Sequence, residues 1–258
     1  MKGVVVVVFF TAFLGDHFSY AALNEVDVPI PVEGVYPRHC NDFENLAHPG
    51  QSGVILIQPN EKEEPFRVYC DMNDHGGGWV RIQHAYKHHF SFNRSLASYE
   101  EGFGLLDGDG WLGLDKIHRL TNGDYKAVLL VKMTDYNGRE YYAQYDTFIV
   151  EGADKGYRLT VANYSGDAGD ALSYSCNATF STYDVDTDDS SHNCASYYKA
   201  GWWYKDCFRG KLNGDSPNQV YVRYTQGRSR YRTRINTGVF LKWNGNVLRQ
   251  AEMKIRLA

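Results

Sequence analysis

Five cysteines limit the folds that are open to this chain, because the cell compartment decides whether such residues become crosslinks, metal ligands or free thiols. They are Cys40, Cys70, Cys176, Cys194 and Cys207. Their odd number leaves one cysteine over when the others are paired within the chain. The chemistry of the cysteines therefore depends on where the chain is sent after synthesis.

The first 21 residues are typical of a cleavable signal peptide. Lys2 precedes an apolar run over residues 3–14, which is about half of the ~20 residues that a bilayer-spanning helix needs. The small residues Ser19 and Ala21 follow, so we expect cleavage after Ala21; the alternative is a buried amino-terminal strand. Since no later segment is long and apolar enough to cross a bilayer, we predict a secreted, extracellular protein with no membrane span.

Secretion makes disulfide bonds the default state of the cysteines. Cys194 and Cys207 enclose a short loop, and in the chain-entropy model closing a loop of that size is worth ~3 kcal/mol. Cys40 and Cys70 are a second candidate pair, although the count of cysteines does not choose among the pairings. Glycosylation sequons fit the same secretory route, and they begin at Asn93, Asn163 and Asn177.

The composition favours a globular domain that is rich in strands. Hydrophobic residues make up 43% of the chain and aromatic residues 15%, which excludes a disordered chain and suits strands better than helical bundles. The formal net charge is −4, so we expect no nucleic-acid partner. Residues 22–39 contain three prolines and are interpreted as a short amino-terminal leader, and residues 40–258 as one domain.

Hydrophobic patterning predicts an α+β fold. Two short helices are expected: one begins at the capping-box pattern Ser98-x-x-Glu101, and one carries Leu114, Ile117 and Leu120 on a single face. Beyond Ser165 the chain becomes rich in Gly, Asp, Asn and Ser, and loops of that length usually hold function or need crosslinks. Strands are predicted over residues 53–57, 66–69, 79–83, 125–133, 141–150, 157–163 and 253–257.

An acidic run in the loop-rich part is a candidate calcium site. Asp184, Asp186, Asp188 and Asp189 place carboxylates close together along the chain, and a curled loop would converge their oxygens on one point, as Ca²⁺ requires. The run is not an EF-hand, because the sixth position is Asp189 instead of Gly. The alternative is a solvated acidic loop.

A second candidate site is a series of arginines that alternates with Ser, Tyr and Thr. In an extended segment these arginines lie on one face, where guanidinium groups would pair with sulfate, carboxylate or phosphate. The alternative is an edge strand that is protected by charge. The series consists of Arg228, Arg230, Arg232 and Arg234.

Catalytic motifs are weak, and we predict that the protein is not an enzyme. Neither G-x-S-x-G nor H-E-x-x-H occurs. Residues 108–113 match G-x-G-x-x-G but follow no predicted strand, so they are interpreted as a turn. The aromatic run Trp202-Trp203-Tyr204 is interpreted as part of the core and not as a cofactor site.

Taken together, the segments resemble the fibrinogen carboxy-terminal domain family, which includes the ficolins, the tachylectins and the microfibril-associated glycoproteins. The resemblance covers the chain from about Cys40 to Arg256. The motifs that carry it include Val68-Tyr-Cys-Asp-Met72, Gly76-Gly-Gly-Trp79, Trp111-Leu-Gly-Leu-Asp-Lys-Ile-His-Arg-Leu-Thr121, Phe180-Ser-Thr-Tyr-Asp184, Asn193-Cys-Ala195, Trp202-Trp-Tyr204 and Glu252-Met-Lys-Ile-Arg256.

The resemblance implies a three-part domain with mainly antiparallel sheets, few short helices and a loop-rich, calcium-binding carboxy-terminal part. It pairs Cys40 with Cys70 and Cys194 with Cys207, and it leaves Cys176 for an intermolecular bond in a homo-oligomer or for a free thiol. Aligned on Asn193-Cys194, the family's calcium ligands fall on the side chains of Asp186 and Asp188 and on the backbone carbonyls of Ser190 and His192. Asp184 is then not a direct ligand.

The resemblance also implies a pocket for acetyl groups beside the calcium ion. Tyr198 matches a pocket tyrosine, and the Asp206–Cys207 bond matches a peptide bond that is cis in relatives. Phe208 stands where relatives commonly carry His, and Ile235-Asn-Thr-Gly238 replaces their Tyr-Ala-x-Gly.

These features predict a secreted, calcium-binding recognition protein of the lectin type. We expect it to bind acetylated or sulfated glycans or glycoproteins, with contacts at Tyr198 and Phe208 and at the arginine series, and to serve innate immune pattern recognition. The alternative is a matrix or microfibril-associated adhesion protein whose acetyl-sugar pocket does not function.

Overall fold

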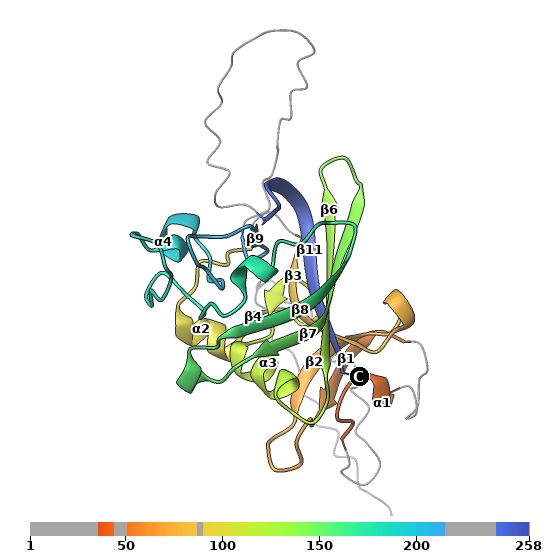
Figure 1. Ribbon diagram of the computed structural model, residues 1–258. Helices are drawn as coiled ribbons and strands as arrows, with labels where there is room; N and C mark the ends of the chain where they lie inside the picture. The colour runs from red at the N-terminus through yellow and green to blue at the C-terminus, as the bar shows by residue number, and fades with distance from the viewer. Residues whose placement is uncertain (1–35, 44–50, 87–89, 215–240, 258) are drawn as a thin grey trace, which may run out of the picture.

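The computed structural model describes residues 36–43, 51–86, 90–214 and 241–257, and a long, twisted antiparallel sheet dominates it (Figure 1). The strand order is β1-β2-β3-β11-β6-β7-β8. The strands are β1 (Gly53–Ile57), β2 (Phe66–Asp71), β3 (Trp79–Ala85), β6 (Ala127–Asp135), β7 (Glu140–Val150), β8 (Leu159–Gly166) and β11 (Asn246–Leu257).

The carboxy-terminal strand β11 occupies the middle of the sheet. It pairs with β3 on one side and with β6 on the other, so the last residues of the domain join its first half to its second. The predicted strand over residues 253–257 is therefore too short. The exposed Arg249 and half-buried Gln250 hide the periodicity of the first half of β11, which the pairing with β6 imposes.

The helices are short and lie on different sides of the sheet: in Figure 1, α2 (Leu96–Glu101) and α4 (Cys194–Tyr198) are on the left, and α1 (Cys40–Phe43) is at the lower right. Helix α3 (Leu114–Thr121) buries Leu114, Ile117 and Leu120, as the three-residue spacing predicts. The elements of this kind are α1 (Cys40–Phe43), α2 (Leu96–Glu101), α3, α4 (Cys194–Tyr198), and the 3₁₀ turns η2 (Asp74–Gly76), η3 (Ala153–Lys155) and η4 (Ser173–Ser175).

Helix α2 begins earlier than the capping-box pattern predicts. Ser95 is its N-cap, and the Ser95 hydroxyl accepts a hydrogen bond from the backbone N–H of Ser98 at 3.3 Å. Ser98 is therefore the third helical residue and not the cap. The expected start at Ser98 was wrong, because the Ser95 side chain already caps the free N–H groups of the first helical turn. The helix therefore begins about one turn earlier than predicted.

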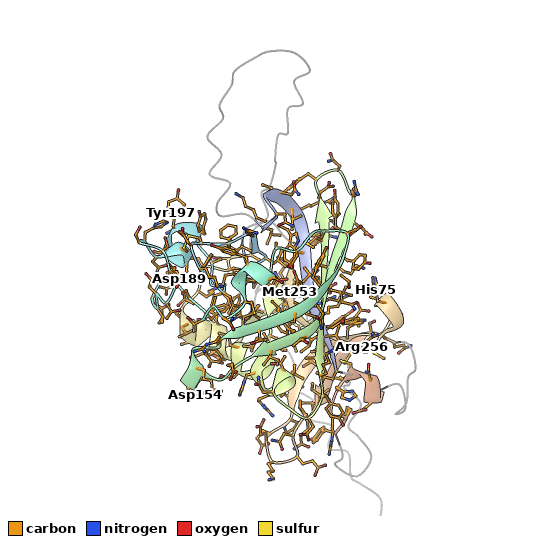
Figure 2. All side chains as sticks on the ribbon, viewed as in Figure 1. His75, Asp154, Asp189, Tyr197, Met253 and Arg256 are labelled. Atoms are coloured by element: carbon orange, nitrogen blue, oxygen red, sulfur yellow. A yellow bond between two sulfur atoms is a disulfide. The ribbon has the colours of Figure 1, made fainter. Side chains whose placement is uncertain are left out.

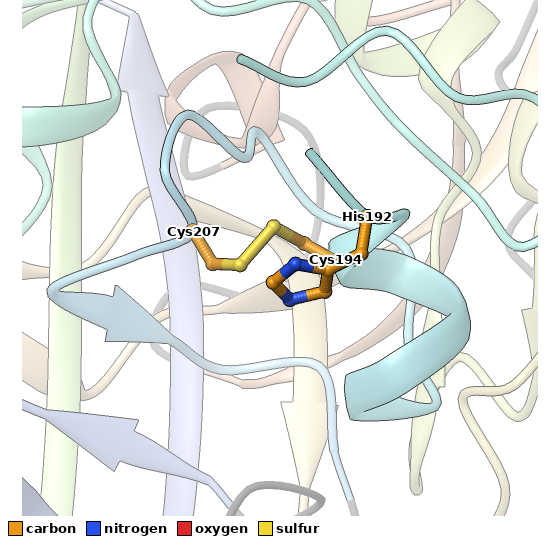
Figure 3. Close-up of side chains that lie close together, drawn as sticks. All are labelled: His192, Cys194 and Cys207. Carbon is orange, nitrogen blue, oxygen red and sulfur yellow. A yellow bond between two sulfur atoms is a disulfide. The ribbon is translucent and has the colours of Figure 1, made fainter. Parts of the chain in front are cut away.

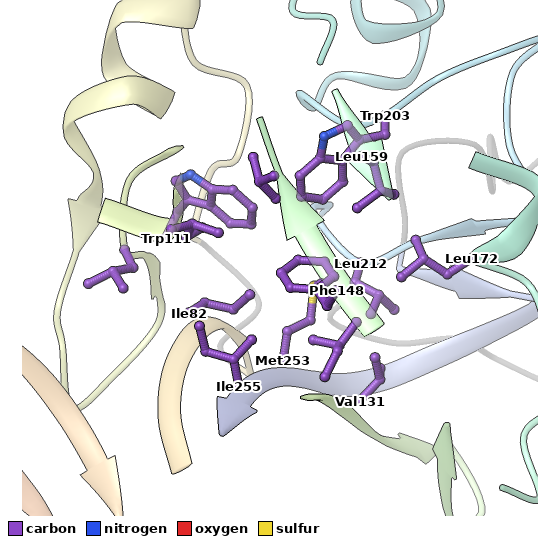
Figure 4. Packing of buried hydrophobic residues seen from close by; sticks show 14 of the residues in the cluster. Ile82, Trp111, Val131, Phe148, Leu159, Leu172, Trp203, Leu212, Met253 and Ile255 are labelled. Carbon is purple, nitrogen blue, oxygen red and sulfur yellow. The ribbon is translucent and has the colours of Figure 1, made fainter. Parts of the chain in front are cut away.

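Aromatic side chains join the sheet to the loop-rich part of the domain. Trp202, Trp203 and Tyr204 are at most 1% exposed, which confirms that this run belongs to the core. The ring centroids of Trp203 and Phe148 on β7 lie 6.3 Å apart and perpendicular, and Figure 4 shows both rings within the same hydrophobic cluster. Burial of such large rings anchors the loops to the sheet.

Short strands connect the loops that surround the core. They are β4 (Phe103–Gly104), β5 (Gly110–Trp111), β9 (Gly210–Lys211) and β10 (Lys242–Trp243). Strand β10 pairs with both β9 and β11, which ties the loop-rich part to the central strand. Residues 108–113, interpreted above as a turn, contain β5 and lead into α3.

Ion pairs of a buried lysine connect the amino-terminal strands to β11. The Lys254 side chain is 1% exposed, and its ammonium group lies 2.6 Å from the carboxylates of Asp71 and Asp74 and 3.1 Å from that of Glu252. At the same end of β11, Arg256 donates to the carbonyl of His75 at 3.1 Å, and Figure 2 shows both side chains there. The turn after β2 is thus held by charge.

Among the described residues, no helix has the length and the apolar composition that crossing a membrane would require.

Candidate functional site

The acidic run forms a loop that begins against α2. The carboxylate of Asp184 accepts hydrogen bonds from the Leu96 N–H at 3.1 Å and from the Thr182 hydroxyl at 2.7 Å. These bonds fasten the start of the loop and leave the later carboxylates to face one another. Asp184 therefore acts as a loop anchor, in keeping with an alignment that does not make it a calcium ligand.

Asp186 and Asp188 lie close together in the same loop. The Asp188 carboxylate accepts hydrogen bonds from the N–H groups of Ser190 at 3.0 Å and Cys194 at 2.9 Å, and Asp186 accepts a long one from the Asp188 N–H at 3.4 Å. Burial raises the pKa of Asp188, and the neighbouring Asp186 carboxylate raises it further, which together outweigh the two backbone hydrogen bonds.

The four oxygens that the resemblance selects suit a hard cation. Ca²⁺ is bound by carboxylate and carbonyl oxygens. Within the described residues, no basic side chain forms an ion pair with Asp186 or Asp188. There too, the carbonyls of Ser190 and His192 accept no backbone hydrogen bond. The donor set fits Ca²⁺.

A disulfide closes the loop on its far side. Cys194, the first residue of α4, is bonded to Cys207, and Cys40 is bonded to Cys70, as the resemblance implied. His192 lies beside the Cys194–Cys207 bond (Figure 3). This group is not a metal site, because both sulfurs are committed to the disulfide and the thiolate is the form that binds metals.

A hollow of about 640 Å³ opens next to the disulfide. Tyr198 and Phe208 both line it, with ring centroids 4.8 Å apart and ring planes nearly perpendicular. His192, from the end of the acidic loop, lines it as well. The structure therefore brings together the predicted calcium loop and the two predicted contact residues in one place.

Basic residues that the sequence analysis did not select also surround the hollow. Arg209 and Lys242 line it, and burial lowers the pKa of Lys242. The buried Lys211 donates to the Asn213 carbonyl at 3.0 Å and lies 5.8 Å from the centre of the Phe208 ring. Arg209 could have been noticed beside Phe208, but Lys242 reaches the site only through the pairing of β10 with β9.

The peptide bond between Asp206 and Cys207 is trans, because the described residues contain no cis peptide bond. The structure therefore differs here from the relatives, in which the matching bond is cis. Trans is the ordinary state of a bond that does not precede proline, since the cis form costs ~3 kcal/mol.

Other predicted residues lie outside the described part or apart from the hollow. Arg228, Arg230, Arg232 and Arg234, together with Ile235, fall in residues 215–240, outside the described residues. Residues 1–35, with the predicted signal peptide and most of the predicted leader, fall outside them too. The sequon asparagines are all exposed, and they are Asn93, Asn163 and Asn177.

Cys176 is the free cysteine of the described residues. It is half-buried, and its sulfur lies 3.6 Å from the carbonyl oxygen of Val161 on β8. An intermolecular bond at this residue stays a prediction.

Comparison with known proteins gives the same fold over nearly the whole chain. A family model described as the fibrinogen beta and gamma chains, C-terminal globular domain, matches residues 36–258. Fibrinogen C domain-containing protein 1 of Mus musculus is 38% identical over 239 residues, which are 88% of this chain and 50% of the relative. The chain thus spans about half the length of this relative.

Solved structures of related proteins have the same fold. The fibrinogen-like globe domain of human ANGPTL6 superposes with a TM-score of 0.73 at 35% identity, over 85% of this chain and 95% of that one. Lamprey fibrin D-dimer, in complex with the peptide Gly-His-Arg-Pro-amide, gives a TM-score of 0.74 at 27% identity, over 92% of this chain and 78% of that one. The chain therefore belongs to the fibrinogen-related family, and residues 36–258 are its fibrinogen C-terminal globular domain.

Proposed function

We propose that this protein is a secreted, calcium-binding recognition protein of the lectin type, which binds acetylated or sulfated glycans or glycoproteins and converts none of them. The observation that carries the proposal is the meeting of the acidic loop, the Cys194–Cys207 bond and the aromatic pair Tyr198–Phe208 around one hollow. Innate immune pattern recognition is the role that this binding would serve.

Calcium would act on the shape of the site. Asp186 and Asp188 would hold the ion together with the carbonyls of Ser190 and His192, and the ion would neutralise two carboxylates that repel each other. His192 also lines the hollow, so a fixed loop places one wall of the ligand site. The chain's own contribution is the disulfide, which limits how far α4 can move from Cys207.

The hollow offers two kinds of contact to a ligand. The faces of Tyr198 and Phe208 give an apolar surface for the methyl group of an acetyl substituent or for the flat face of a sugar ring. Arg209 and Lys242 supply positive charge at the same hollow, which would pair with a sulfate or carboxylate group. An acidic, acetylated sugar satisfies both.

A single hollow of this kind gives weak binding, so useful affinity would come from several linked copies. Cys176 is the proposed link, because it is the cysteine left over by the two disulfides. A non-reducing gel of the wild type should then show dimers or larger species that Cys176→Ser removes, and monomer in both proteins would end the idea of a covalent link.

The proposal is tested on an array of acetylated, sulfated and neutral glycans, with calcium and again with chelator. We expect calcium-dependent binding that Tyr198→Ala abolishes and that Tyr183→Ala leaves unchanged. Tyr183 is a matched control, because it is 47% exposed and does not line the hollow. Binding to no glycan would contradict the proposal and favour a matrix or adhesion protein that binds other proteins.

A further inference from the structure

A second cleft, with a volume of about 290 Å³, shares no lining residue with the hollow beside the calcium loop. Strands β2 and β3, helix α3 and the loop between β4 and β5 supply its walls. We call it the β3–α3 cleft. Nothing in the proposed lectin function uses it.

Three basic side chains from three elements line the β3–α3 cleft: Arg67 on β2, Arg81 on β3 and Lys116 on α3. Arg81 is fixed in place, because its guanidinium group lies 2.5 Å from Glu252 and 4.0 Å from the centre of the Tyr69 ring. A cation that is already immobilised loses little conformational entropy when a ligand arrives.

Among the described residues, Arg67 and Lys116 form no close ion pair, although the carboxylates of Asp115 and Glu101 act on Lys116 from beyond ion-pair distance and favour its charged form. Arg67 is exposed. The Lys116 ammonium group donates to the carbonyl oxygen of Glu101 at 2.5 Å, and burial lowers the pKa of Lys116. An anionic ligand would favour the charged form of this lysine.

The rim of the cleft is aliphatic. The Leu105 side chain is 65% exposed, although it belongs to a large apolar residue, and Leu106 also lines the cleft. The loop that carries them is closed by a hydrogen bond from the Leu105 N–H to the Asp109 carbonyl at 2.9 Å. Gly104 permits this closure at φ +89°, where a Cβ atom would lie 2.2 Å from the Asp109 carbonyl oxygen.

We propose that the β3–α3 cleft binds an acidic peptide segment of a partner protein, with carboxylates against Arg67, Arg81 and Lys116 and an aliphatic side chain against Leu105 and Leu106. The cleft selects an anion, because these three basic side chains outnumber Glu101, the carboxylate among its described lining residues. Sugar rings stack on flat aromatic faces and gain little from branched side chains. Of the aromatic residues that line the cleft, Trp111 is only 2% exposed and Phe103 is half-buried, so the exposed aliphatic rim favours a peptide over a sugar.

The test uses a blocked, fluorescein-labelled pentapeptide of alternating glutamate and leucine, followed by fluorescence anisotropy. We expect saturable binding that weakens at least about tenfold in Arg67→Glu and in Lys116→Gln, as expected for the loss of a charge-assisted contact. Leu105→Ala should weaken it as well. Arg158→Glu is the matched control, because Arg158 is exposed and lines no part of the cleft, and its affinity should stay within about twofold of the wild type.

Three comparisons distinguish this peptide site from other anion binding. Peptides with glutamine for glutamate, or alanine for leucine, should each bind more weakly, and chelator should change nothing. Equal binding by wild type and by the folded Arg67→Glu and Leu105→Ala variants would overturn the proposal. So would a sulfated disaccharide that binds with the same dependence on Arg67 while the peptide does not bind.

Discussion

The ammonium group of Lys254 on β11 lies 2.6 Å from the carboxylate of Asp74, a residue 180 positions earlier in the chain. Asp74 also pairs with Lys132 on β6 at 2.9 Å, so three separate segments meet at one carboxylate. Burial by itself raises the pKa of Asp74, but hydrogen bonds from Lys254 and Lys132 outweigh it and hold that pKa far below its ordinary value.

Replacing Lys254 with methionine should destabilise the domain strongly. The variant leaves the carboxylates of Asp71, Asp74 and Glu252 close together without the cation that they share, and breaking a buried ion pair in this way costs about 3–5 kcal/mol. Urea denaturation at pH 7 measures the loss. Lys132→Met is the control, because the Lys132 side chain is 35% exposed and, within the described part of the chain, forms an ion pair only with Asp74. It should cost much less, and an equal loss would mean that burial of Lys254 is unimportant.

The same network predicts how stability depends on pH. The folded-state pKa values of Asp71 and Asp74 lie below the ordinary value of 3.8, so their contribution is present above about pH 4 and is lost as the pH falls through the folded values. The pKa of Lys254 is raised above 10.5 because its three carboxylate neighbours outweigh burial. Its contribution is therefore full below about pH 10.5 and is lost as the pH rises through the folded value.

Urea denaturation midpoints between pH 3 and pH 7 test the predicted direction of this pH dependence. The wild type should lose stability below pH 4. In Lys254→Met, protonation would remove the repulsion between the crowded carboxylates. The same fall in pH should therefore lower the stability of this variant less than that of the wild type, or even raise it. Parallel curves for the two proteins would contradict the assignment.

Removal of calcium should lower the melting temperature. A ligand present at 100 times its dissociation constant stabilises the folded state by ~2.7 kcal/mol, which for a domain of this size is a shift of roughly 5–10 °C. Calorimetry with calcium and with chelator should show this shift in the wild type and in Asp189→Asn. Asp188→Asn, which makes the same change of charge at a proposed ligand, should melt at one temperature in both conditions.

Loss of the N-cap of α2 should cost about 1 kcal/mol. The change is Ser95→Ala, made in an Asn93→Gln background because Ser95 is also part of the Asn93 sequon. Ser98→Ala in the same background is the control: it keeps the backbone N–H from which the Ser95 hydroxyl accepts and removes only the contact between the two hydroxyls, which lie 3.0 Å apart. A larger loss at Ser98 than at Ser95 would restore the capping box that the sequence suggested.

The sequence predicted those parts of the fold that local periodicity specifies. Leu114, Ile117 and Leu120 lie on the buried face of α3, and the strand over residues 53–57 matches β1, because each buries one face with a regular period. The first half of β11 was missed. Its neighbours β3 and β6 are far away in the chain, so no local pattern identifies it.

In the candidate site, too, residues within recognisable motifs could be predicted, and residues that long-range pairing brings in could not. Tyr198 and Phe208 could be named in advance because family motifs surround them, and they share one hollow. Lys242 could not, since β10 has only two residues and meets β9 through long-range pairing. The Lys254 network was missed for the same reason, because two of its three carboxylates, those of Asp71 and Asp74, come from the other end of the chain.

The central claim is that the calcium loop and the Tyr198–Phe208 hollow form one ligand site. The most direct measurement is the binding of the protein to immobilised N-acetylated glycan in calcium, in chelator and after calcium is restored. The account predicts binding that chelator removes, that calcium restores and that Asp188→Asn lacks while Asp189→Asn keeps it. Binding of equal strength in calcium and chelator by all three proteins would contradict it.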